Sequence, residues 1–410
     1  MNKKYYFLLI TNFLFISCSV QKIDFETPVD TRTKKINIQK KQVFNIDDFQ
    51  VYASNKFDGA RLNGFSKKND STLVAHISPE NTPINNSPYY AFSTWSDIPQ
   101  TVYITFDYPV GYKHRYVPKI KKNNIWSTID STNIFTQDSI YTIKLNLEKD
   151  PIVIAAQEIQ SSANVKDWYT NLSQIHSNKI SIISAGKTKL KNNLPVLDIS
   201  LGSKQNKPTI VILTRQHPPE VTGYYAFQEF IKTIVSDSNL SNEFLKKYNV
   251  IAFPIMNPDG VDMGHWRHNA GGVDTNRDWS KYRQPEIRNA VKYIAKQLKT
   301  NKSELILGLD FHSTWYDVFY TNKDQSGVKM PNFNSEWFSK MEQNIVNYKV
   351  NEESANSTKP VSKGWFLKAH NSVGITYEIG DKTEKAEIQT IGRVSAEEMM
   401  LILRIKNLSN

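Results

Sequence analysis

The sequence predicts an antiparallel β-sandwich followed by an α/β domain whose sheet has helices on both faces. Segments 101–108 (TVYITFDY) and 139–147 (SIYTIKLNL) alternate apolar and polar residues, and turn-forming clusters separate such segments. This pattern is typical of a sandwich. In the second half of the chain, short apolar strands alternate with segments of helical period, which indicates an α/β domain.

The first eighteen residues have the pattern of an export signal. Lys3 and Lys4 precede an apolar run of about twelve residues, shorter than the roughly twenty that a membrane-spanning helix needs. The run ends before Cys18, the only cysteine, and resembles a bacterial lipoprotein signal, although Phe15 stands where leucine is usual. We expect residues 1–18 to direct export and Cys18 to carry a lipid that anchors the protein to a bacterial membrane, periplasmic or at the cell surface. The alternative is an ordinary signal peptide with a passive cysteine.

The next segment, residues 19–45, is polar and aperiodic, so we expect a tether. The sandwich is expected over residues 46–160 and the α/β domain over 161–410. A single cysteine excludes an intrachain disulfide. Loss of residues 1–18 removes two lysines and no acid, so the net charge falls from +11 to +9, which favours anionic partners. The basic residues are scattered rather than arranged in a basic and aromatic stripe, so we expect no nucleic-acid partner.

A polar stretch at residues 159–179 separates the two parts. Behind His217, the residues Tyr224, Phe227 and Ile231 recur at helical spacing. The expected strands are 194–202, 208–214, 249–257, 304–312 and 373–380, and the further helices are 285–299, a segment near 334–348 and a last helix from 395.

Residues that can bind a metal or transfer a proton follow these strands directly. His217 and Glu220 come after one strand, and His312 and Glu378 end two others. Ligands bind at the carboxyl ends of strands in such sheets, so we expect these side chains to meet. A catalytic zinc takes three imidazole or carboxylate ligands and leaves one position for water. His217, Glu220 and His312 are the expected ligands.

Other interpretations of these histidines stay open. A single HxxE pair also arises by chance, in which case His217 is a hydrogen-bonded loop residue. His265 and His268, on either side of Arg267, form a competing ligand pair, although no nearby acid completes that set at matching spacing.

Four motifs occur in the order seen in the M14 family of zinc carboxypeptidases. They are RQHPPE (215–220), NPDGVDMGHWRHNAGGVDTNRDW (257–279), DFHST (310–314) and TYEIGD (376–381). The C-terminal segment of about 240 residues resembles this family. The resemblance implies a mixed β-sheet and one Zn²⁺ per chain, held by His217, Glu220 and His312.

The resemblance also implies four further roles, carried by five residues. Arg267 would stabilise the oxyanion, while Asn276 and Arg277 would bind the C-terminal carboxylate of the substrate. Asp274 would orient the first zinc histidine, and Glu378 would be the general base. These residue types suit the chemistry, since a guanidinium stabilises an oxyanion or forks onto a carboxylate, and a carboxylate can take a proton from water. Singly, Arg277 could be a surface ion pair, Asp274 a turn residue and Glu378 a strand-end acid.

The front half resembles the β-sandwich that precedes the catalytic domain in the cytosolic carboxypeptidase branch of M14. This resemblance covers about 110 residues and is carried by FDGARLNGF (57–65), ISPEN (77–81), YYAFSTW (89–95) and YVPKIKKNNIWSTI (116–129).

One departure concerns a tyrosine that digestive members carry about twenty residues before the catalytic glutamate, where it closes over the substrate. No tyrosine lies at that distance here, and Tyr348, somewhat earlier, is the candidate for a displaced equivalent. We expect Gly364, Trp365 and Phe366 either to line the side-chain pocket or to be core residues.

The sequence therefore predicts a lipid-anchored zinc metallocarboxypeptidase that hydrolyses C-terminal peptide bonds of substrates with a free carboxylate. One alternative is a cell-wall peptide amidohydrolase of the same family. The other is a catalytically silent surface-binding lipoprotein, which would readily lose Glu378 or a metal ligand, whereas both are present.

Overall fold

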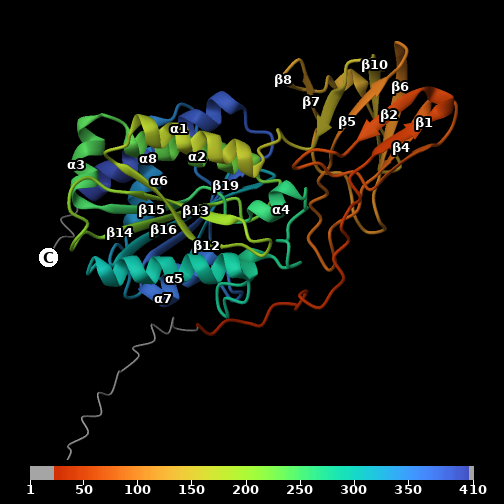
Figure 1. Ribbon diagram of the computed structural model, residues 1–410. Helices are drawn as coiled ribbons and strands as arrows, with labels where there is room; N and C mark the ends of the chain where they lie inside the picture. Colours follow the sequence, from red (N-terminus) through yellow and green to blue (C-terminus); the bar gives the residue numbers. More distant parts are fainter. Residues whose placement is uncertain (1–22, 406–410) are drawn as a thin grey trace, which may run out of the picture.

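The computed structural model describes residues 23–405 and shows two packed parts, a β-sandwich and an α/β body (Figure 1). The expected export signal, with Cys18, lies outside the described residues. Within residues 23–405, none of the helices combines the length and the apolar character needed to cross a membrane.

The sandwich has two sheets whose strand pairs are antiparallel except for β4 and β6, which run parallel. The predicted alternation is confirmed in β6, where Val102, Ile104 and Phe106 point into the core between the sheets. The first sheet contains, in order, β1 (Val43–Ile46), β2 (Val51–Ser54), β5 (Ala91–Ser96), β11 (Ile152–Ala155), β7 (Lys119–Lys122) and β8 (Ile125–Thr128). The second contains β3 (Gly64–Lys67), β4 (Thr72–His76), β6 (Gln100–Asp107), β10 (Ile140–Leu147) and β9 (Ile134–Gln137), and the short helices η1 (Asp47–Phe49) and η2 (Ser131–Asn133) connect strands.

The α/β body is built on a mixed sheet, as the resemblance implies, but the sheet has eight strands where the sequence analysis expected five. Its central strands β15, β14, β16 and β19 are parallel, which brings their carboxyl ends to one edge. In spatial order the strands are β12 (Ile180–Lys187), β13 (Asn193–Ile199), β15 (Asn249–Phe253), β14 (Thr209–Thr214), β16 (Leu305–Thr314), β19 (Val373–Gly380), β17 (Val318–Thr321) and β18 (Glu352–Ser354).

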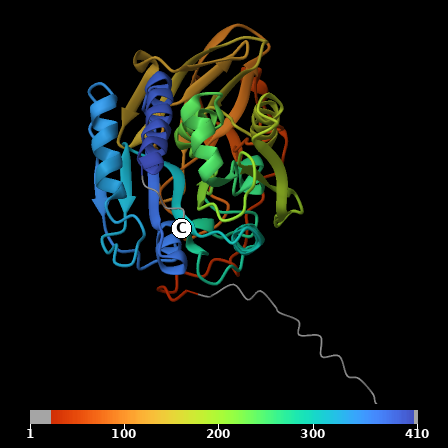
Figure 2. The ribbon, with the colours of Figure 1, turned by 90° about the vertical axis from the view of Figure 1, so that its left-hand side faces the viewer.

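Helices cover both faces of this sheet, and a separate apolar core lies beneath each layer (Figure 1). Figure 2 shows α6 (blue) beside the long helix α8 (dark blue). One layer holds α1 (Ser162–Ile175), α2 (Val221–Val235), α3 (Asn239–Lys247), α6 (Phe333–Asn344) and α8 (Lys385–Ile405). The other holds α5 (Pro285–Thr300) and α7 (Ser362–His370), while α4 (Pro258–Asp262) and η3 (Thr275–Arg277) lie in the loop after β15.

The sequence analysis did not expect helices α3, α4 and α7, and two further helices also differ from the prediction. The polar stretch at residues 159–179 contains α1, which begins at a capping box between Ser161 and Asn164 and buries only three apolar side chains. The last helix begins at Lys385 rather than at 395. In α1, capping and tertiary contacts stabilise a helix whose apolar pattern is sparse. In α8, the added first turns bury Ile388 and Ile391.

The segment expected to be a tether is anchored to both parts of the protein at a few positions within residues 23–42, although most of its side chains are exposed. The segment has no helix or strand and runs beneath the α/β body to the sandwich (Figure 1). Ile23 is 7% exposed and belongs to the core under α5 and α7. Its carbonyl accepts a hydrogen bond of 2.6 Å from Ser280 Oγ, and Gln39 Nε2 donates to Met263 O at 3.0 Å. Isolated apolar and amide side chains anchor the segment without any periodic pattern.

Helix α2 lies against β16 so closely that only glycine fits at the contact. A Cβ atom built on Gly223 would lie 2.1 Å from the backbone oxygen of His312. This close approach sets the separation between the turn that precedes α2 and the strand that carries His312.

We predict that Gly223→Ala lowers the free energy of unfolding by about 1–3 kcal/mol, because overpacking outweighs the gain in helix propensity. Urea denaturation measures the change. Lys232→Ala, on an exposed part of the same helix, is the control and should change stability by less than about 0.5 kcal/mol. A Gly223→Ala protein as stable as the wild type would contradict the packing argument.

Candidate metal centre and catalytic cleft

Two adjacent parallel strands bring the predicted metal ligands together. Strand β14 ends at Thr214, which lies opposite Phe311 of β16, so the following turn reaches His312. The turn contains two prolines, whose rings restrict the backbone, and Glu220 occupies the position just before α2, where its side chain makes no capping hydrogen bond. His217 and Glu220 therefore approach His312 from the carboxyl edge of the sheet.

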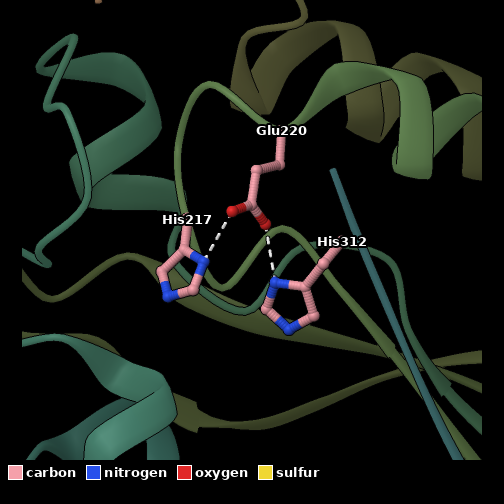
Figure 3. Close-up of side chains that lie close together, drawn as sticks. All are labelled: His217, Glu220 and His312. Carbon is pink, nitrogen blue, oxygen red and sulfur yellow. Dashed lines mark hydrogen bonds and ion pairs between the residues drawn. The ribbon is translucent and has the colours of Figure 1, made fainter. Parts of the chain in front are cut away.

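The three side chains point toward one another (Figure 3). His217 Nδ1 lies 2.8 Å from Glu220 Oε1, and His312 Nδ1 lies 2.6 Å from Glu220 Oε2. Their ligand atoms all lie within 4.8 Å of one another, and the three residues are buried. Within the described chain, they form the one group of three His, Cys, Asp or Glu side chains that could share an ion.

The donor set fits zinc. Two imidazole nitrogens and a carboxylate are a frequent ligand set of catalytic zinc sites, which keep one position open. Burial alone would raise the pKa of Glu220, but the imidazoles of His217 and His312 lower this pKa below its usual value. Both imidazoles favour the carboxylate form, which is the form of Glu220 that can bind a metal.

Glu378 lies beside this group. It is directly opposite His312 in the pairing of β19 with β16, and its Oε2 has no hydrogen-bond partner among the described residues. Burial raises the pKa of Glu378 to about 8, with the charge of Glu220 adding to the effect and His312 opposing it. A cation between the ligands would lower this pKa, because positive charge favours the carboxylate.

Asp274 connects the metal ligands to the arginines. Its Oδ1 lies 2.9 Å from His217 Nε2 and accepts a hydrogen bond of 2.8 Å from the Asn276 backbone nitrogen. Its Oδ2 accepts from Arg267 Nε at 2.7 Å and lies 3.8 Å from Arg277 Nη1. Burial would raise the pKa of Asp274, but Arg267 and then His217 lower it well below its usual value.

A cavity of about 580 Å³ opens over the ligand group, and both parts of the protein line it. The predicted residues Arg267, Asn276, Arg277 and Glu378 all reach it. The sandwich contributes Asn85, Asn86, Ser87 and Arg115, and the α/β body adds Ser313, Thr314, Trp315, Tyr320, Val361, Lys363 and Thr376.

The competing histidines are engaged elsewhere. His265 Nδ1 lies 3.0 Å from His268 O, and His268 Nδ1 lies 2.6 Å from Asn81 Oδ1 of the sandwich. Neither histidine belongs to the candidate metal group of the described residues.

Two expectations about the pocket wall are settled by burial. Trp365 and Phe366 belong to the core beneath α5 and α7 and do not line the cavity, so they are core residues. Tyr348 packs against the other core, whereas the tyrosine that lines the cavity is Tyr320 of β17.

Two functional neighbours were missed by the sequence reasoning. Asp310 is fully buried, and its Oδ2 lies 2.8 Å from His312 Nε2 and accepts from Gln216 Nε2 at 2.5 Å. Its position two residues before His312 on a strand places it on the same face, and this signal could have found it. Lys363 donates to Thr321 O at 2.7 Å, and burial lowers the pKa of its ammonium to about 8. No motif marks Lys363.

A family model described as "Zinc carboxypeptidase" matches residues 165–399, more than half of the chain. The chain belongs to the zinc carboxypeptidase family. The match contains all three predicted metal ligands.

Similar proteins include members of the cytosolic carboxypeptidase group. Cytosolic carboxypeptidase 6 of Caenorhabditis elegans is 26% identical over 216 residues, 48% of this chain and 46% of that protein. Cytosolic carboxypeptidase 3 of Mus musculus is 22% identical over 303 residues, 67% of this chain and 30% of that protein. The chain therefore spans less than half the length of these relatives.

Two bacterial structures have a similar fold over both parts of the chain. A metallo-carboxypeptidase from Burkholderia cenocepacia aligns with a TM-score of 0.73 at 14% identity, covering 86% of this chain and 99% of that one. A metallo-carboxypeptidase from Pseudomonas aeruginosa, in complex with (2-guanidinoethylmercapto)succinic acid, aligns with a TM-score of 0.67 at 14% identity, covering 86% and 98%. The fold of a sandwich followed by an α/β body is thus shared with these two metallo-carboxypeptidase structures.

We predict that the purified protein holds one zinc per chain and that Glu220→Gln weakens zinc binding by more than about 100-fold, beyond the effect of losing an outer-shell partner. Metal analysis and a competition titration with a chromogenic chelator measure this loss. Chelation should also lower the melting temperature of the wild type, since binding to the native state stabilises it. Glu229→Gln, on α2 away from the ligands, is the control. Undiminished zinc affinity in Glu220→Gln would exclude Glu220 as a ligand.

Proposed function

We propose that the protein is a zinc-dependent carboxypeptidase that hydrolyses the C-terminal peptide bond of its substrates. The observation that carries this proposal is the cluster of three ligand atoms within 4.8 Å at the floor of a cavity. The same cavity is lined by a carboxylate, Glu378, and by a possible carboxylate anchor, Asn276 with Arg277.

His217, Glu220 and His312 would hold the zinc. Zinc supplies Lewis acidity, which lowers the pKa of water and polarises a carbonyl group. Asp274 and Asp310 contact the outer nitrogens of the two histidines, at 2.9 and 2.8 Å. Such outer carboxylates orient the rings and keep the inner nitrogens free for the metal.

Glu378 is the proposed general base. Its side chain lines the cavity beside His312, and its unpartnered Oε2 can accept a proton from the attacking water. The carboxyl group can then donate this proton to the leaving amine, so that the glutamate ends each cycle in its starting state.

Arg267 is the proposed oxyanion partner. Its Nε is held by Asp274, and the rest of its guanidinium lies at the cavity wall. Fixed positive charge at this position would stabilise the negative charge that develops on the scissile carbonyl oxygen.

Asn276 and Arg277 are the proposed anchor for the terminal carboxylate. Asn276 Oδ1 accepts from the Ser362 backbone nitrogen at 2.9 Å, which fixes the amide. Arg277 Nη1 donates to Asn276 O at 2.8 Å, and its side chain is 26% exposed. A guanidinium can bind a carboxylate through two parallel hydrogen bonds, which would make the enzyme require a free chain end.

The cellular setting is a separate proposal that rests on the sequence. The N-terminal pattern and Cys18 support an exported protein, lipid-anchored to a bacterial membrane. In that setting, peptides of the cell wall are the second candidate substrates. A catalytically silent binding protein is disfavoured because the full ligand set and Glu378 line one cavity.

We predict that Glu378→Gln keeps zinc at the wild-type level but lowers kcat by about 100- to 10,000-fold, because the ligands remain while the proton acceptor is lost. Metal analysis and steady-state kinetics on a peptide series differing in the last residue test this. Glu384→Gln, an exposed acid six residues later, is the control. Normal turnover in Glu378→Gln would remove this residue from the mechanism.

We predict that Arg277→Ala raises KM for peptides with a free C-terminus by about 10- to 100-fold, the value of a charged hydrogen-bonded pair. Its effect on the corresponding C-terminal amides should be far smaller, because they lack the carboxylate. Arg393→Ala, on exposed α8 surface, should change neither value. Equal effects on acids and amides would argue against an exopeptidase anchor.

A further inference from the structure

A buried carboxylate of the sandwich holds the backbone around Arg267. Glu80 lies in the loop between β4 and β5 and is fully buried. Its carboxylate accepts hydrogen bonds from three successive backbone nitrogens of the α/β body: Trp266 at 2.8 Å, Arg267 at 3.1 Å and His268 at 2.6 Å. One side chain thus satisfies the amides of the proposed oxyanion residue and of both its neighbours.

Adjacent contacts hold the same loop from two further sides. Asn81 Nδ2 donates to Gly272 O at 2.9 Å, and its Oδ1 lies 2.6 Å from His268 Nδ1. The indole of Trp266 is fully buried within the sandwich core, edge-on to Tyr112 at a ring separation of 5.2 Å. Trp266, immediately before Arg267, is therefore buried in the sandwich, and His268, immediately after Arg267, is hydrogen-bonded to the sandwich.

The charge of Glu80 is compensated at this position. Burial would raise its pKa, but His265, His268 and Arg61 together lower it. An ionised carboxylate bound by three amides is a strong and directional anchor, since hydrogen bonds to a charged acceptor are about twice as strong as neutral ones. Removing such a partner leaves buried amides unsatisfied.

The side chain of Arg267 then extends from this anchored backbone toward the cavity. The guanidinium is held through its Nε, which donates to Asp274 at 2.7 Å. The position of the guanidinium therefore also depends on the position of the Arg267 backbone. Shifts of about 1 Å in a positioning group can cost about 100-fold in rate.

We propose that Glu80 is a positioning residue, and that the sandwich acts as part of the catalytic unit by fixing Arg267 rather than as a separable binding module. This inference rests on the proposed carboxypeptidase function. Glu80 contacts neither the metal ligands nor the substrate cavity, so it acts through Arg267. A purely structural role would instead affect stability without depending on this arginine.

A double-mutant cycle between Glu80→Gln and Arg267→Ala tests the inference. In the wild-type background, Glu80→Gln should lower kcat by about 10- to 100-fold, less than complete loss of an oxyanion donor, with KM changed less than about threefold and zinc still bound. In the Arg267→Ala background, the same substitution should lower kcat by less than about threefold, because coupled residues are not additive. Equal losses in both backgrounds, or normal kcat in Glu80→Gln, would overturn the proposal.

Two further variants separate positioning from general destabilisation. Asp198→Asn removes another buried carboxylate, which accepts from Tyr293 Oη at 3.0 Å and lies in β13, outside the loop that carries Arg267. This variant should lower the melting temperature by the same amount whether residue 267 is arginine or alanine. Glu80→Asp keeps the charge and should retain more activity than Glu80→Gln. If Glu80→Gln does not fold, the same cycle is run with Glu80→Asp, and additive losses there would overturn the proposal.

Hydrogen exchange provides a readout that does not depend on turnover. The amides of residues 266–268 should exchange faster in Glu80→Gln or Glu80→Asp than in the wild type. Their exchange should not change in Asp198→Asn. If the wild type cleaves no peptide with a free C-terminus, the proposed function fails. Unchanged exchange at these three amides would overturn the role of Glu80 separately.

Discussion

The buried carboxylate of Glu220, placed between two imidazoles, is the group on which the organisation of the cleft depends. An ionised carboxylate is costly to remove from water unless charged or hydrogen-bonding partners replace the solvent. Both of its oxygens face histidine nitrogens, at 2.8 and 2.6 Å. This arrangement requires the turn after β14 to stay in register with β16, and the close contact of Gly223 with His312 keeps the two elements at that separation.

From this centre, the polar contacts extend outward in one connected path. Asp274 links His217 to Arg267, and Arg267 is linked through its own backbone to Glu80 in the sandwich. A second connection joins the two parts at the cavity rim, where Arg115 pairs with Asp381 at 2.8 Å. Both parts of the protein therefore contribute to the geometry of one site, which agrees with the extent of the structural similarity to the bacterial metallo-carboxypeptidases, 86% of the chain.

The elements predicted correctly from the sequence are those whose residue pattern follows directly from burial. The alternation in β6 and the apolar strands that form β14, β16 and β19 correspond to observed elements, because burial on one or both faces imposes a composition on the strand. Sequence reasoning failed for α1, whose start is defined by a capping box rather than by an apolar stripe. It also gave no sign that single side chains such as Ile23 and Gln39 anchor the otherwise irregular residues 23–42.

The sequence by itself determined the metal-binding group and its place at the carboxyl ends of the strands, because short motifs show both the ligand types and the order of the strands that they follow. The tertiary structure alone decided which residues of the sandwich reach the cavity, namely Asn85, Asn86, Ser87 and Arg115. It also decided that Glu80 meets three amides lying some 190 positions away along the chain. Contacts of this kind depend on how the sandwich packs against the α/β body. No local pattern in the sequence reports contacts between residues so far apart in the chain.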